Sequence, residues 1–324
     1  MARRRVTRKT TAYRILSVDG GGIRGLYAAV LLERLAREVP TLVDGVDLVA
    51  GTSTGGIIAL GLAHGLAPAD LVALYRDRAK EIFDDSWLDD LKDLGGLTGA
   101  DYDNDKLKAL LEDVFGKKTR LKQLKKRVLV PTFDLDNESP DPRKRMWKPK
   151  FFHNYPGPDS DGAELVVDVA LRTSAAPTYF PTYQGYIDGA VVANNPAMAA
   201  FAQALDAGTG KQALQDVRLF SLGTGVNPAY VAGKELDWGY AQWAKPLIAL
   251  MVDGMMGVAD YQCARLLQHR YFRLAPILPE RIGLDDVDKI ADLVKYAQDV
   301  DIQGAVAWLT RYFSPARIDN STRL

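Results

Sequence analysis

The chain has 324 residues, of which 47% are apolar and 25% are charged, and its formal net charge is zero. This composition is typical of a soluble globular protein, and the balanced charge gives no global field that would draw the chain to nucleic acid. Cys263 is the single cysteine, which excludes an internal disulfide and disfavours a thiolate metal site. Because no apolar window of about eighteen residues occurs and the basic N-terminus precedes no apolar stretch, we expect a cytoplasmic protein without a spanning helix or secretory signal.

Apolar runs that end in glycine or polar residues predict strands, and apolar residues at helical spacing predict helices. In chain order we expect a strand at 13–18, a helix at 25–39, a strand at 46–50, helices at 57–65, 68–83 and 105–115, strands at 127–134 and 144–154, a helix at 163–174, a strand end at 186–190, a helix that starts at 195–196, a strand at 217–223, and helices at 240–268 and 285–309. The segment 217–223 is the last clear strand. Strands that alternate with helices indicate one α/β/α domain.

The segment Gly51-Thr52-Ser53-Thr54-Gly55 fits the pattern G-x-S-x-G between an expected strand and an expected helix. A sharp strand-to-helix turn exposes the serine hydroxyl, and glycines on both sides remove side chains that would clash. An ordinary glycine-rich turn would show the same letters, but the flanking strand and helix favour a nucleophile elbow. We therefore predict that Ser53 is a nucleophile, with Gly51 and Gly55 shaping its turn.

The sequence DGGGIRG at 19–25 also joins an expected strand to an expected helix. Gly20, Gly22 and Gly25 fit the dinucleotide pattern G-x-G-x-x-G, which calls for an acidic residue at the end of the next strand. That strand has its only carboxylate, Asp47, at its start. Backbone N–H groups in such a loop also suit a developing oxyanion. We favour the oxyanion hole and keep a nucleotide-binding module as the alternative from another class.

A serine hydroxyl needs a base that accepts its proton. The chain has three histidines, His64, His153 and His269, and the order Ser53, Asp188, His269 is that of an α/β-hydrolase triad. That fold places several strands before its elbow, whereas a single strand–helix unit precedes the strand at 46–50. The triad therefore stays an alternative.

Taken in order, DGGGIRG, GTSTG and the DGA at 188–190 resemble the patatin-like phospholipase family. The resemblance includes SAAPTYFP at 174–181 and NNP at 194–196, and it covers about residues 13–225. It implies a three-layer α/β/α sandwich with a central, mostly parallel sheet. It also implies a Ser–Asp dyad that cleaves lipid esters through an acyl-enzyme without histidine, metal or cofactor. Phospholipase A, lysophospholipase and esterase activities all fit, and acyl transfer to another alcohol is the alternative.

Residue by residue, the resemblance assigns the nucleophile to Ser53 and the base to Asp188, whose pKa partial desolvation should raise. It assigns the oxyanion loop to Gly20, Gly21 and Gly22. Arg24 would stabilise the oxyanion or bind a lipid phosphate. Asn194 and Asn195 would contact the residues of the site without contacting the substrate.

We expect a basic tail over 1–12, one catalytic domain over 13–312 and a C-terminal tail over 313–324. The catalytic domain has a motif-bearing core at 13–225 and a helical part at 226–312. Its partners are expected to be lipid or phospholipid, with peripheral contact to a membrane surface and without nucleic acid. Basic clusters at 117–127 and 143–150, the second with Trp147, are the candidate lipid-surface contacts, although charge runs are usually solvated faces.

Two further patterns have an ordinary explanation. Asp101, Asp103, Asp105 and Glu112 imitate a calcium loop, but Lys106 occupies the position that needs glycine, so we predict an acidic helix start. The second pattern is a methionine cluster within 243–261, which could line an acyl pocket but at helical spacing is more often plain core. Its members are Met251, Met255 and Met256.

Overall fold

The computed structural model describes residues 12–82, 104–177, 179–233 and 237–313. Asp101, Asp103 and most of the two expected tails lie outside these ranges. Only residues 12 and 313 of the tails lie within them. Within the described residues, no helix is long and apolar enough to cross a bilayer.

A seven-stranded sheet forms the centre of the protein, in the order β4-β3-β2-β1-β6-β7, with β5 paired to β3. Strands β3, β2, β1, β6 and β7 run parallel, and β4 and β5 are antiparallel to β3. The strands are β1 (Tyr13–Val18), β2 (Leu48–Gly51), β3 (Arg127–Asp134), β4 (Lys148–His153), β5 (Tyr186–Asp188), β6 (Val217–Leu222) and β7 (Tyr271–Leu274).

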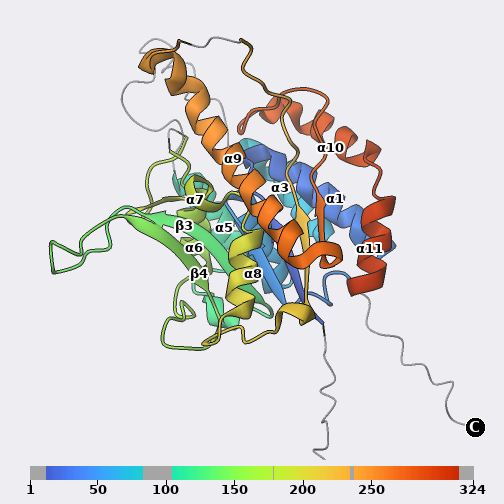
Figure 1. The fold of residues 1–324 in the computed structure, drawn as a ribbon, viewed down its shortest axis with the longest axis horizontal. Helices are drawn as coiled ribbons and strands as arrows, with labels where there is room; N and C mark the ends of the chain where they lie inside the picture. Colours follow the sequence, from blue (N-terminus) through green and yellow to red (C-terminus); the bar gives the residue numbers. More distant parts are fainter. Residues whose placement is uncertain (1–11, 83–103, 178, 234–236, 314–324) are drawn as a thin grey trace, which may run out of the picture.

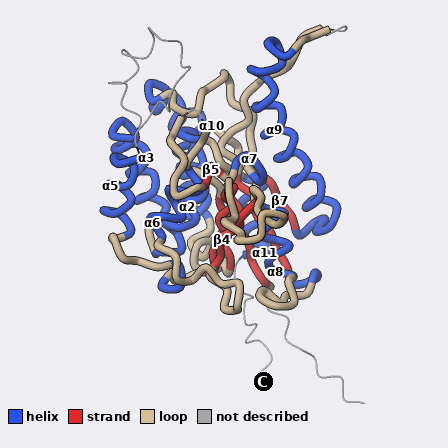
Figure 2. The backbone as a smooth tube through the Cα atoms, turned by 90° about the vertical axis from the view of Figure 1, so that its left-hand side faces the viewer, coloured by secondary structure: helices blue, strands red, loops and turns tan. Residues whose placement is uncertain are grey.

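Helices cover both faces of this sheet, which confirms the predicted α/β/α sandwich (Figure 1). Figure 2 shows α2, α3, α5 and α6 on one side of the strands and α8 and α9 on the other. The helices are α1 (Gly25–Glu38), α2 (Thr54–His64), α3 (Pro68–Ile82), α5 (Asn104–Phe115), α6 (Val166–Ser174), α7 (Ala190–Ala193), α8 (Ala197–Leu205), α9 (Tyr240–Leu267), α10 (Ile290–Asp299) and α11 (Gln303–Phe313).

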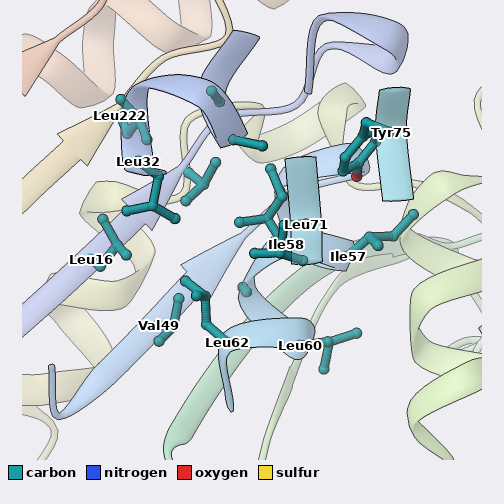
Figure 3. Packing of buried hydrophobic residues seen from close by; sticks show 14 of the residues in the cluster. Leu16, Leu32, Val49, Ile57, Ile58, Leu60, Leu62, Leu71, Tyr75 and Leu222 are labelled. Atoms are coloured by element: carbon teal, nitrogen blue, oxygen red, sulfur yellow. The ribbon is translucent and has the colours of Figure 1, made fainter. Parts of the chain in front are cut away.

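Alternation along the central strands divides the core between the two faces, because successive strand side chains point in opposite directions. Leu16 and Val49 pack with helices α1 and α2 in the larger cluster (Figure 3). Their neighbours Ile15 and Leu48 pack with α8 and with Cys263 and its surroundings on α9. These strands are therefore buried on both faces, which explains why they read as continuous apolar runs.

The structure corrects three expectations about the elements. The sequence predicts no strand after 217–223, but residues 271–274 form β7, which pairs with β6. The expected helix at 285–309 is two helices, because Val300 between them has an extended backbone (φ −65°, ψ 132°). The expected strand at 144–154 is shorter, since β4 begins at Lys148.

Candidate active site

The candidate site lies at the edge of the sheet where the parallel strands end. Val18 of β1 is in register with Gly51 of β2 and Leu222 of β6, so the loops after these three strands meet at one level. A cavity of about 450 Å³ opens there, lined by all three loops. Ligands of open α/β sheets bind at this carboxyl edge.

Ser53 occupies the sharp turn between β2 and α2. Its backbone has φ 55° and ψ −125°, a conformation that non-glycine residues rarely adopt. A Cβ at Gly51 would lie 1.9 Å from the carbonyl oxygen of Gly55, and one at Gly55 would lie 2.4 Å from that of Val18. The two glycines of G-x-S-x-G are therefore sterically required, and the turn presents Ser53 to the cavity.

Asp188 reaches the same cavity from the end of β5, where it is paired with Thr132 of β3. Its carboxylate accepts the N–H of Ala190 at 2.7 Å and interacts with the Ser53 side chain. Burial raises the pKa of Asp188 to about 7, although these two interactions lower it. Desolvation thus makes this carboxylate a stronger base than an exposed aspartate, as expected from the sequence.

The glycine loop after β1 faces Ser53 and is held by close contacts. The N–H of Gly20 donates to the carbonyl of Asn194 at 3.0 Å, and the Thr224 hydroxyl donates to the Gly20 carbonyl at 2.8 Å. A Cβ at Gly21 would lie 2.3 Å from Thr224 Oγ1. Because the N–H of Gly20 is engaged, the predicted oxyanion donors that have no partner among the described residues are those of Gly21 and Gly22.

A carbonyl from the C-terminal part of the chain orients the far end of this loop. The N–H of Ile23 donates to the carbonyl of Leu284 at 2.7 Å. Gly22 has φ +56°, and a Cβ there would lie 2.1 Å from the same oxygen. Gly22 therefore needs to be glycine for two independent reasons, its backbone angle and this contact.

Arg24 lines the cavity beside the glycine loop. Its Nη1 donates to the carbonyl of Gly225 at 3.0 Å, whereas its buried Nε has no partner among the described residues. Burial lowers the pKa of Arg24, and the nearby carboxylates Asp253 and Asp19 partly offset this. A partly desolvated cation with free donor capacity suits an anionic group in the cavity.

A family model described as patatin-like phospholipase matches residues 16–201. The chain belongs to the patatin-like phospholipase family. It is 29% identical to Protein teg of Priestia megaterium over 93% of this chain and 99% of that protein. It is 32% identical to a cGAMP-activated phospholipase of Pseudomonas aeruginosa over 81% and 78% of the two chains. It is 31% identical to Patatin-like protein 2 of Arabidopsis thaliana over 78% and 72%. These matches support a hydrolase of lipid esters.

The two asparagines of the patatin-like NNP segment have different surroundings. Asn194 lines the cavity, and its amide donates to the Gly20 carbonyl at 3.4 Å and to the sulfur of Met256 at 3.0 Å. Asn195 is buried outside the cavity lining, where its side chain accepts the N–H of Ala197 at 3.0 Å. Asn194 therefore supports the glycine loop directly, whereas Asn195 closes a short turn just before α8, whose N-cap residue is Pro196.

The three histidines of this patatin-like chain all lie away from the cavity lining. His64 is at the end of α2, and His269 is exposed after α9. His153 is buried at the end of β4, with its Nε2 3.5 Å from Asp159. The carboxylate that contacts the Ser53 hydroxyl has no imidazole beside it, and this arrangement differs from a Ser–Asp–His triad.

The cavity extends well beyond the residues that the sequence motifs identify. Its apolar wall combines Ile57, Tyr75, Leu107 and Phe180 from four segments of the chain. Of the three clustered methionines, Met256 is among the lining residues. Further lining residues follow the end of the family match, on the loop after β6, on α9, on β7 and at 281–284. No motif pointed to them, because they meet the site only through the fold.

The structure also includes residues of two further sequence patterns, the acidic segment and the basic clusters. The helix α5 begins at Asn104 with Asp105 in its first turn, so the acidic helix start is confirmed for the described residues. The basic residues at 117–127 and 143–150 are mostly exposed, and Trp147 is 71% exposed.

Proposed function

We propose that this protein hydrolyses carboxylic ester bonds of lipids, with Ser53 as nucleophile and Asp188 as general base. The observation that carries the proposal is that these two side chains line the same cavity and interact there, where burial raises the pKa of Asp188 to about 7. At neutral pH, a base with a pKa near 7 is deprotonated in a large fraction of molecules, and it still binds a proton strongly enough to accept one from serine.

The reaction would take place in two steps. As Ser53 Oγ forms a bond to the ester carbonyl carbon, its proton passes to Asp188, and the carbonyl π electrons move to the oxygen. The N–H groups of Gly21 and Gly22 stabilise that oxyanion, and each such donor is typically worth about 3–4 kcal/mol. Collapse breaks the bond to the alcohol oxygen, which takes the proton from Asp188. Water then attacks the acyl-enzyme by the same route and releases the fatty acid.

The lining of the cavity supports a lipid substrate. Apolar side chains such as Ile57, Leu107 and Phe180 form one wall, which suits an acyl chain. Arg24 and the exposed Arg281 line another part and suit the phosphate of a phospholipid. A phospholipase A or lysophospholipase reaction would use both parts, whereas a simple ester would use the first alone.

Helix α9 gives this site a surface for peripheral contact with lipid. Its inner face, with Val252 and Met256, lines the cavity. Its outer face exposes apolar side chains over several turns and ends at Arg265, whose guanidinium lies 5.2 Å from the Tyr261 ring. A lipid surface with phosphate groups complements both features. The exposed side chains on this face are Leu247, Leu250, Met251, Val258 and Tyr261.

The test is a panel of monomeric esters, lysophospholipids and phospholipids assayed with the wild type, Ser53→Ala and Asp188→Asn. Both variants should lose hydrolysis while their circular dichroism spectra match the wild type. Mass spectrometry should find an acyl adduct on the peptide that contains Ser53 in the wild type. Full activity of Ser53→Ala would refute the proposal. Products that carry the acyl group on an added alcohol would instead favour the transferase alternative.

A further inference from the structure

The backbone N–H of Ser53 has a partner that comes from a distant helix. It donates to the hydroxyl oxygen of Thr173 at 3.0 Å, and Thr173 lies in the last turn of α6 with no exposed surface. Because the positive φ of Ser53 turns this N–H away from an ordinary strand or helix ladder, a side-chain acceptor is needed there. Thr173 is that acceptor.

The orientation of the Thr173 hydroxyl is itself determined. Its single proton is donated to the carbonyl of Pro131 in β3 at 2.6 Å, which directs a lone pair toward Ser53. Its methyl group packs against Gly56, where a Cβ would lie 2.8 Å from Thr173 Cγ2. The side chain is therefore held through both of its branches.

The same short segment also holds Asp188. Two residues after Thr173, the carbonyl of Ala175 accepts the N–H of Asp188 at 2.9 Å. Asp188 is paired with Thr132, the neighbour of Pro131 in β3. The backbone of Asp188 is thus attached directly to the end of α6 and to β3, and the backbone of Ser53 is attached to the end of α6 through Thr173, which is itself bonded to β3.

We propose that Thr173 is a positioning residue that sets the geometry between the Ser53 hydroxyl and the Asp188 carboxylate. The inference rests on the proposed function of that pair. Thr173 itself touches neither substrate nor the transferred proton. Thr173 holds the strained turn in one conformation and thereby determines the position of Ser53 Oγ.

Loss of the hydroxyl has a specific consequence for the base. Without it, the buried N–H of Ser53 loses its acceptor and the carbonyl of Pro131 loses a donor, so the turn should relax. As Ser53 Oγ withdraws, Asp188 loses the interaction with Ser53 that lowers its pKa. The pKa of Asp188 should then rise further above its ordinary value, because burial is unchanged.

The experiment compares Thr173→Val, which keeps the shape and removes the hydroxyl, with Thr173→Ser, which keeps the hydroxyl. On a monomeric ester, the valine variant should lose kcat on the order of 100-fold with KM little changed, as for a misplaced reacting group. Its acid limb should also move to higher pH. The serine variant should restore most of kcat and the original limb.

Val169→Ala, a buried change on the same helix, is the matched control for destabilisation and should keep kcat and the pH limb. If Thr173→Val does not fold, Thr173→Cys replaces it, with the same expected directions. A folded valine or cysteine variant with wild-type kcat and an unmoved limb would overturn the inference, as would a serine variant as slow as valine. Failure of the proposed function is separate, because it would appear as an active Ser53→Ala.

Discussion

Arg273 and the buried Asp19 form a bidentate ion pair, with Nη2 2.6 Å from Oδ2 and Nη1 3.2 Å from Oδ1. Asp19 opens the glycine loop after β1 and is 1% exposed, and Arg273 lies on β7. Arg273 also donates to the Ser221 hydroxyl at 2.7 Å. A strand that the sequence did not reveal therefore supplies the partner of the first residue in the DGGGIRG motif.

Removal of one member of this pair should be costly, because it leaves the other charge buried without compensation. We expect Arg273→Met to lower the free energy of unfolding by about 3–5 kcal/mol, measured by urea denaturation. The double variant Asp19→Asn with Arg273→Met should recover part of that loss, since no buried charge remains. Equal losses in the single and double variants would show that lost packing of Arg273, rather than the charge of Asp19, sets the cost.

The backbone of Ser53 predicts an unusual pattern of stability. Glycine adopts a positive φ without steric cost, whereas alanine keeps the Cβ that opposes it. Both Ser53→Gly and Ser53→Ala should be inactive, but the glycine variant should be more stable by about 1 kcal/mol. This difference is the backbone strain that glycine relieves minus the stability that glycine loses because its unfolded chain has more conformational entropy. Chemical denaturation of the pair measures this difference. An alanine variant at least as stable as glycine would argue against strain at Ser53.

The pKa of Asp188 predicts the acid limb of catalysis. Its deprotonated form is the base, and burial raises its pKa from 3.8 to about 7. With a monomeric ester, kcat/KM should be level above about pH 7 and fall about tenfold per pH unit below it. The measurement is initial rate against pH at substrate concentrations below KM. A limb near pH 4 would mean that the base titrates like an exposed carboxyl group.

The same shift predicts how stability depends on pH. Because the folded-state pKa lies above the unfolded value, the folded protein binds a proton between about pH 4 and 7 that the unfolded chain does not, and stability falls as pH rises through this window. The shift corresponds to about 4 kcal/mol as an upper limit. Asp188→Asn lacks this titration, so its stability relative to the wild type should increase from pH 4.5 to pH 8. Urea unfolding at the two values tests this, and a constant difference would contradict it.

The outer face of α9 predicts a separation between two kinds of substrate. Replacement of Leu250 and Met251 by aspartate should reduce hydrolysis of phospholipid vesicles by about tenfold or more while a monomeric ester is still cleaved, since the cavity side of α9 is untouched. Leu214→Asp, an exposed apolar site before β6, is the matched control and should affect neither. Equal loss on both substrates would refute the lipid-surface role, and concentration-dependent dimers lost in the variant would assign the face to self-association.

Much of the framework could be predicted from local patterns. The strands at 13–18, 127–134 and 217–223 agree closely with β1, β3 and β6, because each contains at least four consecutive buried residues. The strand β7 was missed, since YFRL is only four residues long and directly follows a long helical pattern. Two short helices were joined into one because both sides of Val300 share helical spacing.

By itself, the sequence determined the steric part of the site. The positive φ of Ser53 and the clash that requires glycine at position 51 involve only residues of the turn, so they follow from neighbours along the chain. Other glycine clashes are with Val18, Thr224 and Leu284, which the fold brings to the site. Only the tertiary structure decided which groups meet there. The burial that raises the pKa of Asp188, the hydroxyl of Thr173 and the carbonyl of Leu284 depend on long-range packing. Hydrogen bonds and desolvation act between groups that are close in space. Residues far apart in the sequence therefore form no local pattern that predicts these contacts, because only the folded sheet brings the residues together.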